Sequence, residues 1–129
     1  MSNEVLSFMF PTLELDENGI FIETHVDEFV TVDLAMFVAE ERKRIAGREK
    51  KPLLVLFNKM VGFDPKTRNY TDRILENVSA IGFYVNCDSD EGIKTKEVME
   101  SFYEITPYPV PVKIFDNKTE AIDWLKTLI

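Results

Sequence analysis

Cysteine and histidine are the scarcest reactive residues in this chain of 129 residues. Cys87 is its single cysteine and His25 its single histidine. One cysteine can form neither an internal disulfide nor a cysteine-based metal site, and one histidine excludes a histidine-rich metal site. The low cysteine content is typical of a reducing compartment.

Long apolar runs are also lacking. No run approaches the roughly 18 residues that a membrane-spanning helix needs. The first residues, Met1-Ser2-Asn3-Glu4, have none of the basic and apolar character of a secretory signal. We therefore expect no membrane insertion and a cytoplasmic protein.

The five glycines are scattered, and no glycine-rich motif results. Neither a Walker loop nor Gly-x-Gly-x-x-Gly is present, so we expect no nucleotide or other cofactor. No Gly-x-Ser-x-Gly elbow is present either. A triad of His25 with a serine stays open, because triads are spatial and not sequential arrangements. The serines considered for it are Ser7, Ser79, Ser89 and Ser101.

Positive charge is in the minority, with 15 Lys and Arg against 23 Asp and Glu and a net charge of −8. This balance argues against nucleic acid and anionic membranes as main partners. The cations gather at the C-terminal end of one predicted helix, at Arg42, Lys43, Arg44, Arg48, Lys50 and Lys51. We interpret them as a solvated helix end that includes a Glu40–Arg44 ion pair, in preference to an anion or partner site.

What the chain does contain is 45% hydrophobic and 12% aromatic residues, enough to build a core. Leu13 and Leu15 alternate with polar residues, a turn follows at residues 16–19, and alternation resumes from Ile20. This pattern predicts a β-hairpin. From Thr31, which can cap, the period changes to that of a helix over residues 32–47. The apolar stripe of that helix is Leu34, Phe37, Val38 and Ile45.

The remainder alternates buried strands with helices. We predict strands at Leu53–Phe57, Ala80–Val85 and Val112–Phe115. The second helix begins at Pro65, capped by Asp64, with Tyr70, Ile74, Leu75 and Val78 on its apolar face. A third helix follows the caps at residues 88–90 and ends before Pro107. A last helix, capped by Asn117, is buried through Ala121, Trp124, Leu125, Leu128 and Ile129.

The order is β-β-α-β-α-β-α-β-α, without a long linker or an internal repeat. It predicts an α/β fold, a single layered domain over residues 1–129 with a mixed four- or five-stranded sheet. Strands joined by single helices pair in parallel, and the hairpin adds an antiparallel edge.

Ligands of open α/β sheets usually sit beyond the carboxyl ends of the parallel strands. The candidates that we place on or beside those loops are Asn58, Lys59, Asp64, Lys66, Thr67, Thr71, Cys87, Asp88 and Ser89. Each also has a structural explanation. Asp64 suits a helix cap, Thr67 and Thr71 point toward the sheet, and Cys87 is a buried structural thiol. The Asp88 segment resembles a calcium loop, but Met99 stands where that loop needs glutamate, so we expect no metal.

Glu41 is a further candidate, because it projects into the apolar stripe of the first helix. Either its aliphatic stem packs while its carboxylate reaches water, or the helix overhangs the sheet and forms the rim of a cavity. The sequence leaves both alternatives open.

The chain also resembles a known group, the small bacterial STAS-like proteins related to the anti-sigma-factor antagonist SpoIIAA and to lipid-binding-like relatives. The likeness spans nearly the whole chain in the order of its elements. It is carried by Lys51-Pro52-Leu53-Leu54-Val55 and is most specific in the last thirty or so residues. The segments there are Ser101-Phe102-Tyr103, Pro107-Tyr108-Pro109, Val112-Lys113-Ile114-Phe115 and Asn117-Lys118-Thr119-Glu120-Ala121-Ile122-Asp123-Trp124-Leu125.

The resemblance implies a four- or five-stranded sheet with helices against it, and an interaction or ligand-sensing module that is not an enzyme. In the sigma-antagonist branch an Asp-Ser pair at the start of the second helix carries a phosphorylatable serine. The matching segment here is Gly62-Phe63-Asp64-Pro65-Lys66-Thr67, in which no serine follows Asp64.

Two functions follow as hypotheses. The first is a regulatory module that binds a protein partner through Lys59–Thr71. The second is a carrier or sensor of a small apolar or anionic ligand, held in a cavity between helices and sheet.

Overall fold

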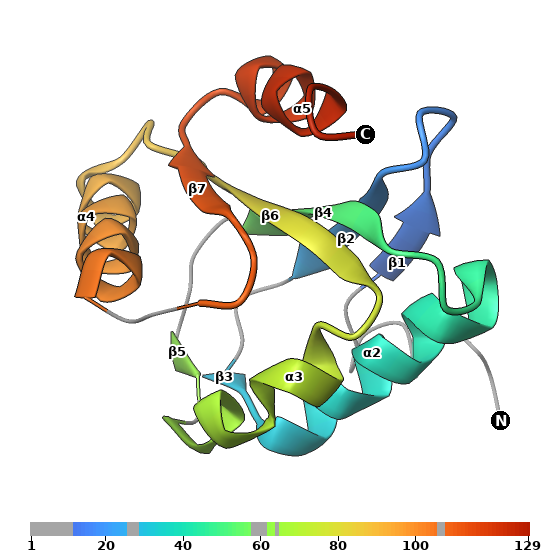
Figure 1. The fold of residues 1–129 in the computed structure, drawn as a ribbon. Helices are drawn as coiled ribbons and strands as arrows, with labels where there is room; N and C mark the ends of the chain where they lie inside the picture. The colour runs from blue at the N-terminus through green and yellow to red at the C-terminus, as the bar shows by residue number, and fades with distance from the viewer. Residues whose placement is uncertain (1–11, 26–28, 58–61, 64, 106–107) are drawn as a thin grey trace, which may run out of the picture.

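The structure is a computed structural model that describes residues 12–25, 29–57, 62–63, 65–105 and 108–129 (Figure 1). Its strands are β1 (Thr12–Leu15), β2 (Phe21–His25), β3 (Phe29–Val30), β4 (Lys51–Phe57), β5 (Gly62–Phe63), β6 (Val78–Val85) and β7 (Val112–Phe115). Its helices are α2 (Val32–Ala46), the 3₁₀ helix η1 (Pro65–Tyr70), α3 (Thr71–Ile74), α4 (Asp90–Ile105) and α5 (Lys118–Lys126).

The main sheet has five strands in the order β1-β2-β4-β6-β7. β1 pairs with β2 antiparallel, and each of the other pairs is parallel. This topology confirms the predicted mixed α/β sheet with an antiparallel edge. A second sheet, in which β3 pairs with β5 in parallel, was not among the predicted elements.

The β1–β2 hairpin forms where the turn residues predicted it. The Asp16 carboxylate accepts hydrogen bonds from the backbone N–H groups of Asn18 and Ile20, both at 2.9 Å. Gly19 has a φ of +81°, a conformation that L-residues with a side chain rarely adopt. The turn chemistry thus fixes the register that puts β2 into the sheet.

Helix α2 has the predicted span, but its buried face differs from the predicted one. The Thr31 hydroxyl caps the helix by accepting the Leu34 N–H at 3.1 Å, and Gly47 ends it. Phe37 and Ile45, predicted to be core residues, are 44% and 38% exposed. Arg42, predicted to lie at a solvated helix end, is only 2% exposed.

The second helix is shorter than predicted. Residues 65–70 form a 3₁₀ helix and only residues 71–74 an α-helix. Val78, predicted to belong to this helix, instead begins β6, where it pairs with Lys51 and is fully buried. Tyr70 is 40% exposed. Pairing with β4 therefore outweighs the helical spacing at this point.

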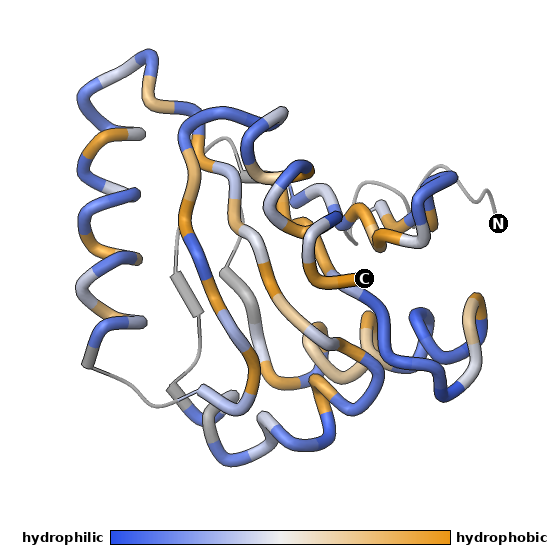
Figure 2. The backbone as a smooth tube through the Cα atoms, turned by 45° about the horizontal axis from the view of Figure 1, so that its top comes forward, coloured by the Kyte–Doolittle hydropathy of each residue, from blue (hydrophilic) through white to orange (hydrophobic). Residues whose placement is uncertain are grey.

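The two faces of the main sheet are covered differently (Figure 1). Helix α5 packs over β4, β6 and β7 on one face, while α2, α3 and α4 lie on the other. Figure 2 shows hydrophobic residues alternating with hydrophilic ones along α4, as expected for a helix with one buried side. In α5, Ala121 and Leu125 are buried. Leu128 and Ile129, which follow the helix and were predicted to be core residues, are exposed.

Candidate functional site

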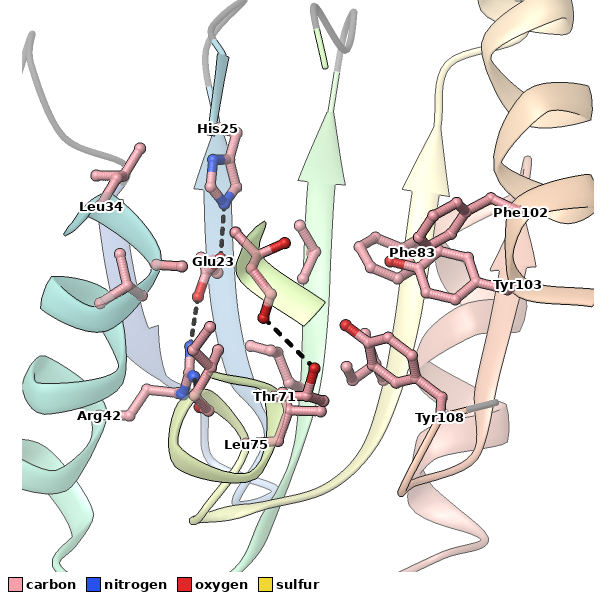
Figure 3. Close-up of a pocket in the computed structure, with 17 residues that line it drawn as sticks. Glu23, His25, Leu34, Arg42, Thr71, Leu75, Phe83, Phe102, Tyr103 and Tyr108 are labelled. Atoms are coloured by element: carbon pink, nitrogen blue, oxygen red, sulfur yellow. Dashed lines mark hydrogen bonds and ion pairs between the residues drawn. The ribbon is translucent and has the colours of Figure 1, made fainter. Parts of the chain in front are cut away.

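A partly enclosed cavity of about 110 Å³ lies between the sheet and the helices α2, α3 and α4 (Figure 3). Its floor follows one row across the sheet, because Glu23 pairs with Val55, and Val55 with Phe83. The cavity therefore sits over the middle of β2, β4 and β6. This place differs from the carboxyl-end loops at which the sequence predicts a ligand site.

One wall of the cavity is polar and is held together by Glu23. Arg42 Nη1 donates to Glu23 Oε1 at 2.8 Å, and His25 Nε2 lies 2.6 Å from Glu23 Oε2. Arg42 Nη2 also donates to the Ile74 carbonyl at 2.6 Å. All three side chains are buried. We call Glu23, His25 and Arg42 the polar triad.

The polar triad keeps its carboxylate ionised. Burial alone would raise the pKa of Glu23. The hydrogen bond with His25 and the positive charge of Arg42 outweigh burial and hold the pKa below its ordinary value. Buried ion pairs of this kind persist only with good geometry and further hydrogen bonds. The Nη2 bond to Ile74 supplies one such bond.

Glu23 is not among the residues predicted from the sequence, and Arg42 was predicted to face solvent. A signal for both was nevertheless present. Phe21, Glu23 and His25 alternate along β2, so all three side chains face the same side of the sheet. Arg42 follows Val38 by four residues, and Val38 follows Leu34 by four, which places the guanidinium on the buried stripe of α2.

The opposite wall is aromatic and comes from β6, α4 and the segment before β7. Tyr103 stacks on Phe83 with ring centroids 5.3 Å apart. Phe102 and Tyr108 each meet Tyr103 edge to face, at 4.9 and 5.1 Å. Offset and edge-to-face contacts at these distances are the favourable ones for aromatic rings. We call Phe83, Phe102, Tyr103 and Tyr108 the aromatic wall.

The two tyrosines of the aromatic wall remain neutral phenols over the whole physiological pH range. Burial raises the pKa of Tyr103 well above its usual value, and the Tyr108 hydroxyl beside it acts in the same direction. Burial also raises the pKa of Tyr108. Their hydroxyls therefore act as hydrogen-bonding groups and not as charges.

Thr67 and Thr71 lie at the cavity, between the two walls. Both side chains are half-buried, and the Thr71 hydroxyl reaches the Thr67 carbonyl at 3.5 Å. The predicted orientation of these threonines, toward the sheet, is thereby confirmed. Lys66 is exposed. The predicted candidates Asn58, Lys59 and Asp64 lie outside the described residues.

The other predicted candidates do not line this cavity. Glu41 is half-buried and pairs with Arg44 at the surface, where a Glu40–Arg44 pair was predicted. Cys87 is half-buried, and its thiol lies 3.5 Å from the Val85 carbonyl. Burial, followed by the charge of Asp116, raises the pKa of this thiol, so little of it is the nucleophilic thiolate. Ser89 caps α4 by accepting the Gly92 N–H at 3.1 Å, and Asp88 is exposed.

The described part of the chain contains neither a candidate metal cluster nor a candidate membrane-spanning helix. It holds no group of three or more His, Cys, Asp or Glu residues arranged to bind a metal ion. It also holds no helix with the length and apolar character needed to cross a membrane.

Comparison with known proteins gives a family and a structural likeness. A family model described as "Domain of unknown function (DUF7793)" matches residues 13–129. No curated protein matches the chain in sequence. One similar solved structure is an uncharacterized protein of the DUF3478 family from Shewanella loihica PV-4, described as having a SpoIIAA-like fold. The likeness covers 89% of this chain and 91% of that one, with 13% identity and a TM-score of 0.49.

Proposed function

The chain belongs to the DUF7793 family of domains of unknown function, and from its cavity we propose that it is a regulatory module that binds a small organic molecule. The observation that carries this proposal is the cavity over Glu23, Val55 and Phe83, with the polar triad on one side and the aromatic wall on the other. Mostly apolar pockets with a few fixed polar groups are the usual form of small-molecule sites.

The volume sets the size of the ligand. Roughly 10–15 Å³ is enough for one water molecule, whereas sites for drug-sized ligands usually measure about 300–1,000 Å³. At about 110 Å³ the cavity lies between these limits. It suits a compact molecule of a few carbon atoms or one ring, and is too small for a nucleotide.

The sequence left an apolar and an anionic ligand open, and the electrostatics of the cavity argue against the anionic one. Arg42 is a buried cation, but Glu23 compensates its charge at 2.8 Å. An anion entering the cavity would lose its hydration without meeting an uncompensated charge from this pair. Neutral hydroxyls, from Thr71 and Tyr108 among others, supply the remaining polar contacts.

We propose binding, without a reaction, although Glu23 and His25 resemble the carboxylate and imidazole of a hydrolytic triad. Both carboxylate oxygens of Glu23 have partners, one of them Arg42, which makes the pair part of a structural ion-pair network. The serines considered for a triad and described by the structure, Ser79, Ser89 and Ser101, are not among the residues that line the cavity.

The regulatory part of the proposal rests on the segment over the cavity. Within residues 65–74, Thr67 and Thr71 line the cavity while Lys66 is exposed. This segment overlaps the partner surface predicted from the sequence, Lys59–Thr71. A ligand that touches the threonines would therefore act directly on the backbone that presents the partner surface, which is how a sensor couples the two events.

Native mass spectrometry of freshly purified protein tests the binding. We expect a retained mass of a small organic molecule, lost on denaturation. Ala35 lines the cavity, so Ala35→Leu adds volume to α2 there and abolishes retention. Ala46, on the same helix, does not line the cavity, so Ala46→Leu makes the same change there and leaves retention intact.

Two results would contradict the proposal. One is the absence both of retained mass and of thermal stabilisation by any member of a library of fragments with one ring or fewer. The other is equal retention by wild type and Ala35→Leu. The same two variants, used as baits in pull-down experiments, test whether the cavity regulates partner binding. If Ala35→Leu, whose cavity is filled, and Ala46→Leu, whose cavity is open to ligand, recover identical partners, the regulatory part of the proposal is wrong.

A further inference from the structure

The two walls of the cavity differ in chemistry, and together they restrict the class of ligand. This inference rests on the proposed function and goes beyond it. We infer that the ligand is an uncharged compound with a single aromatic ring and one hydrogen-bonding group. In this arrangement the ring packs on the aromatic wall and the polar group faces the polar triad and the threonines (Figure 3).

The ring is inferred from the continuity of the aromatic wall. Phe83, Tyr103 and Phe102 are linked by a stacked and an edge-to-face contact, and Tyr108 extends the series, with centroids 4.9–5.3 Å apart throughout. All four side chains also line the cavity. A guest ring can therefore continue the series, and each such contact strengthens binding roughly two- to tenfold beyond simple burial.

The single polar group is inferred from where the polar atoms lie. Glu23, His25 and Arg42 come from β2 and α2, on the side of the cavity opposite the aromatic side chains of β6 and α4 (Figure 3). Thr71 lies between them. A ligand polar at one end and aromatic at the other satisfies both walls, whereas a wholly apolar ligand would leave the polar side facing hydrocarbon.

The absence of net charge is inferred from the ion pair. The guanidinium of Arg42 and the carboxylate of Glu23 cancel at 2.8 Å, and Arg42 also donates to the Ile74 carbonyl. Tyr103 and Tyr108 are neutral. An anionic ligand would lose its hydration at a guanidinium that the Glu23 carboxylate already neutralises.

Three probes of similar size separate these properties. Phenol is aromatic and uncharged, cyclohexanol has the same hydroxyl without aromaticity, and benzoate is aromatic but anionic. Titration calorimetry at pH 7 with the protein stripped of bound material gives the affinity for each. We expect phenol to bind at least about twofold more tightly than cyclohexanol, from one or more aromatic contacts. Benzoate should be the weakest.

A pair of matched variants assigns the preference to the aromatic wall. Phe83 and Phe115 are both buried, at 6% and 7% exposed, but on opposite faces of the sheet. Phe83→Leu keeps apolar bulk and should reduce the phenol preference over cyclohexanol to near unity. Phe115→Leu makes the same change away from the cavity and should leave the preference as in wild type.

The outcomes distinguish this inference from the proposed function. Equal binding of phenol and cyclohexanol would overturn the aromatic assignment, and tighter binding of benzoate would overturn the uncharged one. In either case the cavity would still be a ligand site. If none of the three probes binds although a native mass is retained, the ligand class is wrong and the function stands. If no probe binds, no mass is retained and no fragment of the library stabilises the protein, both fail.

Discussion

The two faces of the main sheet solve the same packing problem in different ways. Under α5, Ile20, Leu54 and Ala80 form an apolar layer with Ala121 and Leu125, each of these side chains essentially inaccessible to solvent. The opposite face holds a cavity, a buried ion pair and a histidine. The same strands supply both faces, so the difference lies in alternate side chains and in the helices above them.

The helices account for much of this contrast. Helix α5 spans nine residues and packs directly on β6, so closely that a Cβ added to Gly82 would lie 3.3 Å from Leu125. On the other face, α2 and α4 lie toward opposite edges of the sheet (Figure 1). Between them lies the short η1–α3 segment, of which only four residues are α-helical. So short a segment leaves space over the central strands, and this space is the cavity.

The largest expected effect comes from breaking the ion pair on the cavity face. Glu23→Leu leaves Arg42 buried and without its carboxylate, a change that costs about 3–5 kcal/mol of the free energy of unfolding. Replacing both partners, in Glu23→Leu/Arg42→Met, removes the uncompensated charge and should restore most of that loss. Urea denaturation, monitored by circular dichroism, measures both variants against wild type.

The double variant is the sharper half of this test. If the polar triad only stabilises the fold, the double variant remains stable and still retains ligand as well as wild type. If the polar triad orients the ligand, the double variant remains stable but retains less. A single variant that loses less than about 1 kcal/mol would show that Arg42 finds solvent or another partner, and that the pair is not a buried one.

A pair of leucines gives the next largest effect and compares the two faces directly. Leu125 lies on the buried side of α5 and is fully buried, whereas Leu34 lines the cavity and is 9% exposed. Leucine-to-alanine changes in cores cost about 2–5 kcal/mol. We expect Leu125→Ala near the top of that range and Leu34→Ala near the bottom, because a side chain that borders a void has fewer contacts to lose. Equal costs in urea denaturation would mean that the cavity face is packed as densely as the α5 face.

The main sheet was predictable from the sequence because its signals are local. Turn residues at Asp16 and Gly19, caps at Thr31 and Asn117, and period-2 or unbroken apolar runs each act over a few residues. The second helix was predicted too long because the spacing of Ile74, Leu75 and Val78 fits a helix, whereas pairing of Val78 with Lys51 depends on a distant strand. The β3–β5 pair, two residues a side, gives too little pattern to detect.

The site was harder to predict because it depends on which face of each element is covered. Arg42 stands in a cluster of cations, and most cations in such clusters are solvated. Its burial follows only once β2 places Glu23 beneath it, nineteen positions away in the sequence. The polar residues on the Phe21 side of β2 were the available clue. Thr67 and Thr71 line the cavity, although Thr67 belongs to a 3₁₀ helix and the same α-helical phase misplaced Val78.

The smallest expected effect is a pH dependence confined to the cavity face. The pKa of Glu23 lies below its ordinary value of 4.5, because the bond with His25 and the charge of Arg42 outweigh burial. A carboxyl with a lowered pKa binds fewer protons in the folded state than in the unfolded state. Its stabilising contribution is therefore complete above pH 4.5 and is lost as the pH falls through the folded-state pKa.

Many carboxyls titrate in this range, so the informative quantity is the difference between wild type and Glu23→Gln. Glutamine keeps the size of the side chain but cannot ionise, so Glu23→Gln should be the less stable protein near pH 7. As the pH falls below 4.5, wild type loses stability faster, and the two free energies of unfolding should converge. Parallel curves from pH 7 down to pH 3 would show that Glu23 has the same proton affinity in both states.

The α5 face supplies the baseline, because its buried cluster has no ionisable side chain among its described members. Leu125→Ala should be destabilised relative to wild type by the same amount at every pH, because this substitution removes packing contacts and no titrating group.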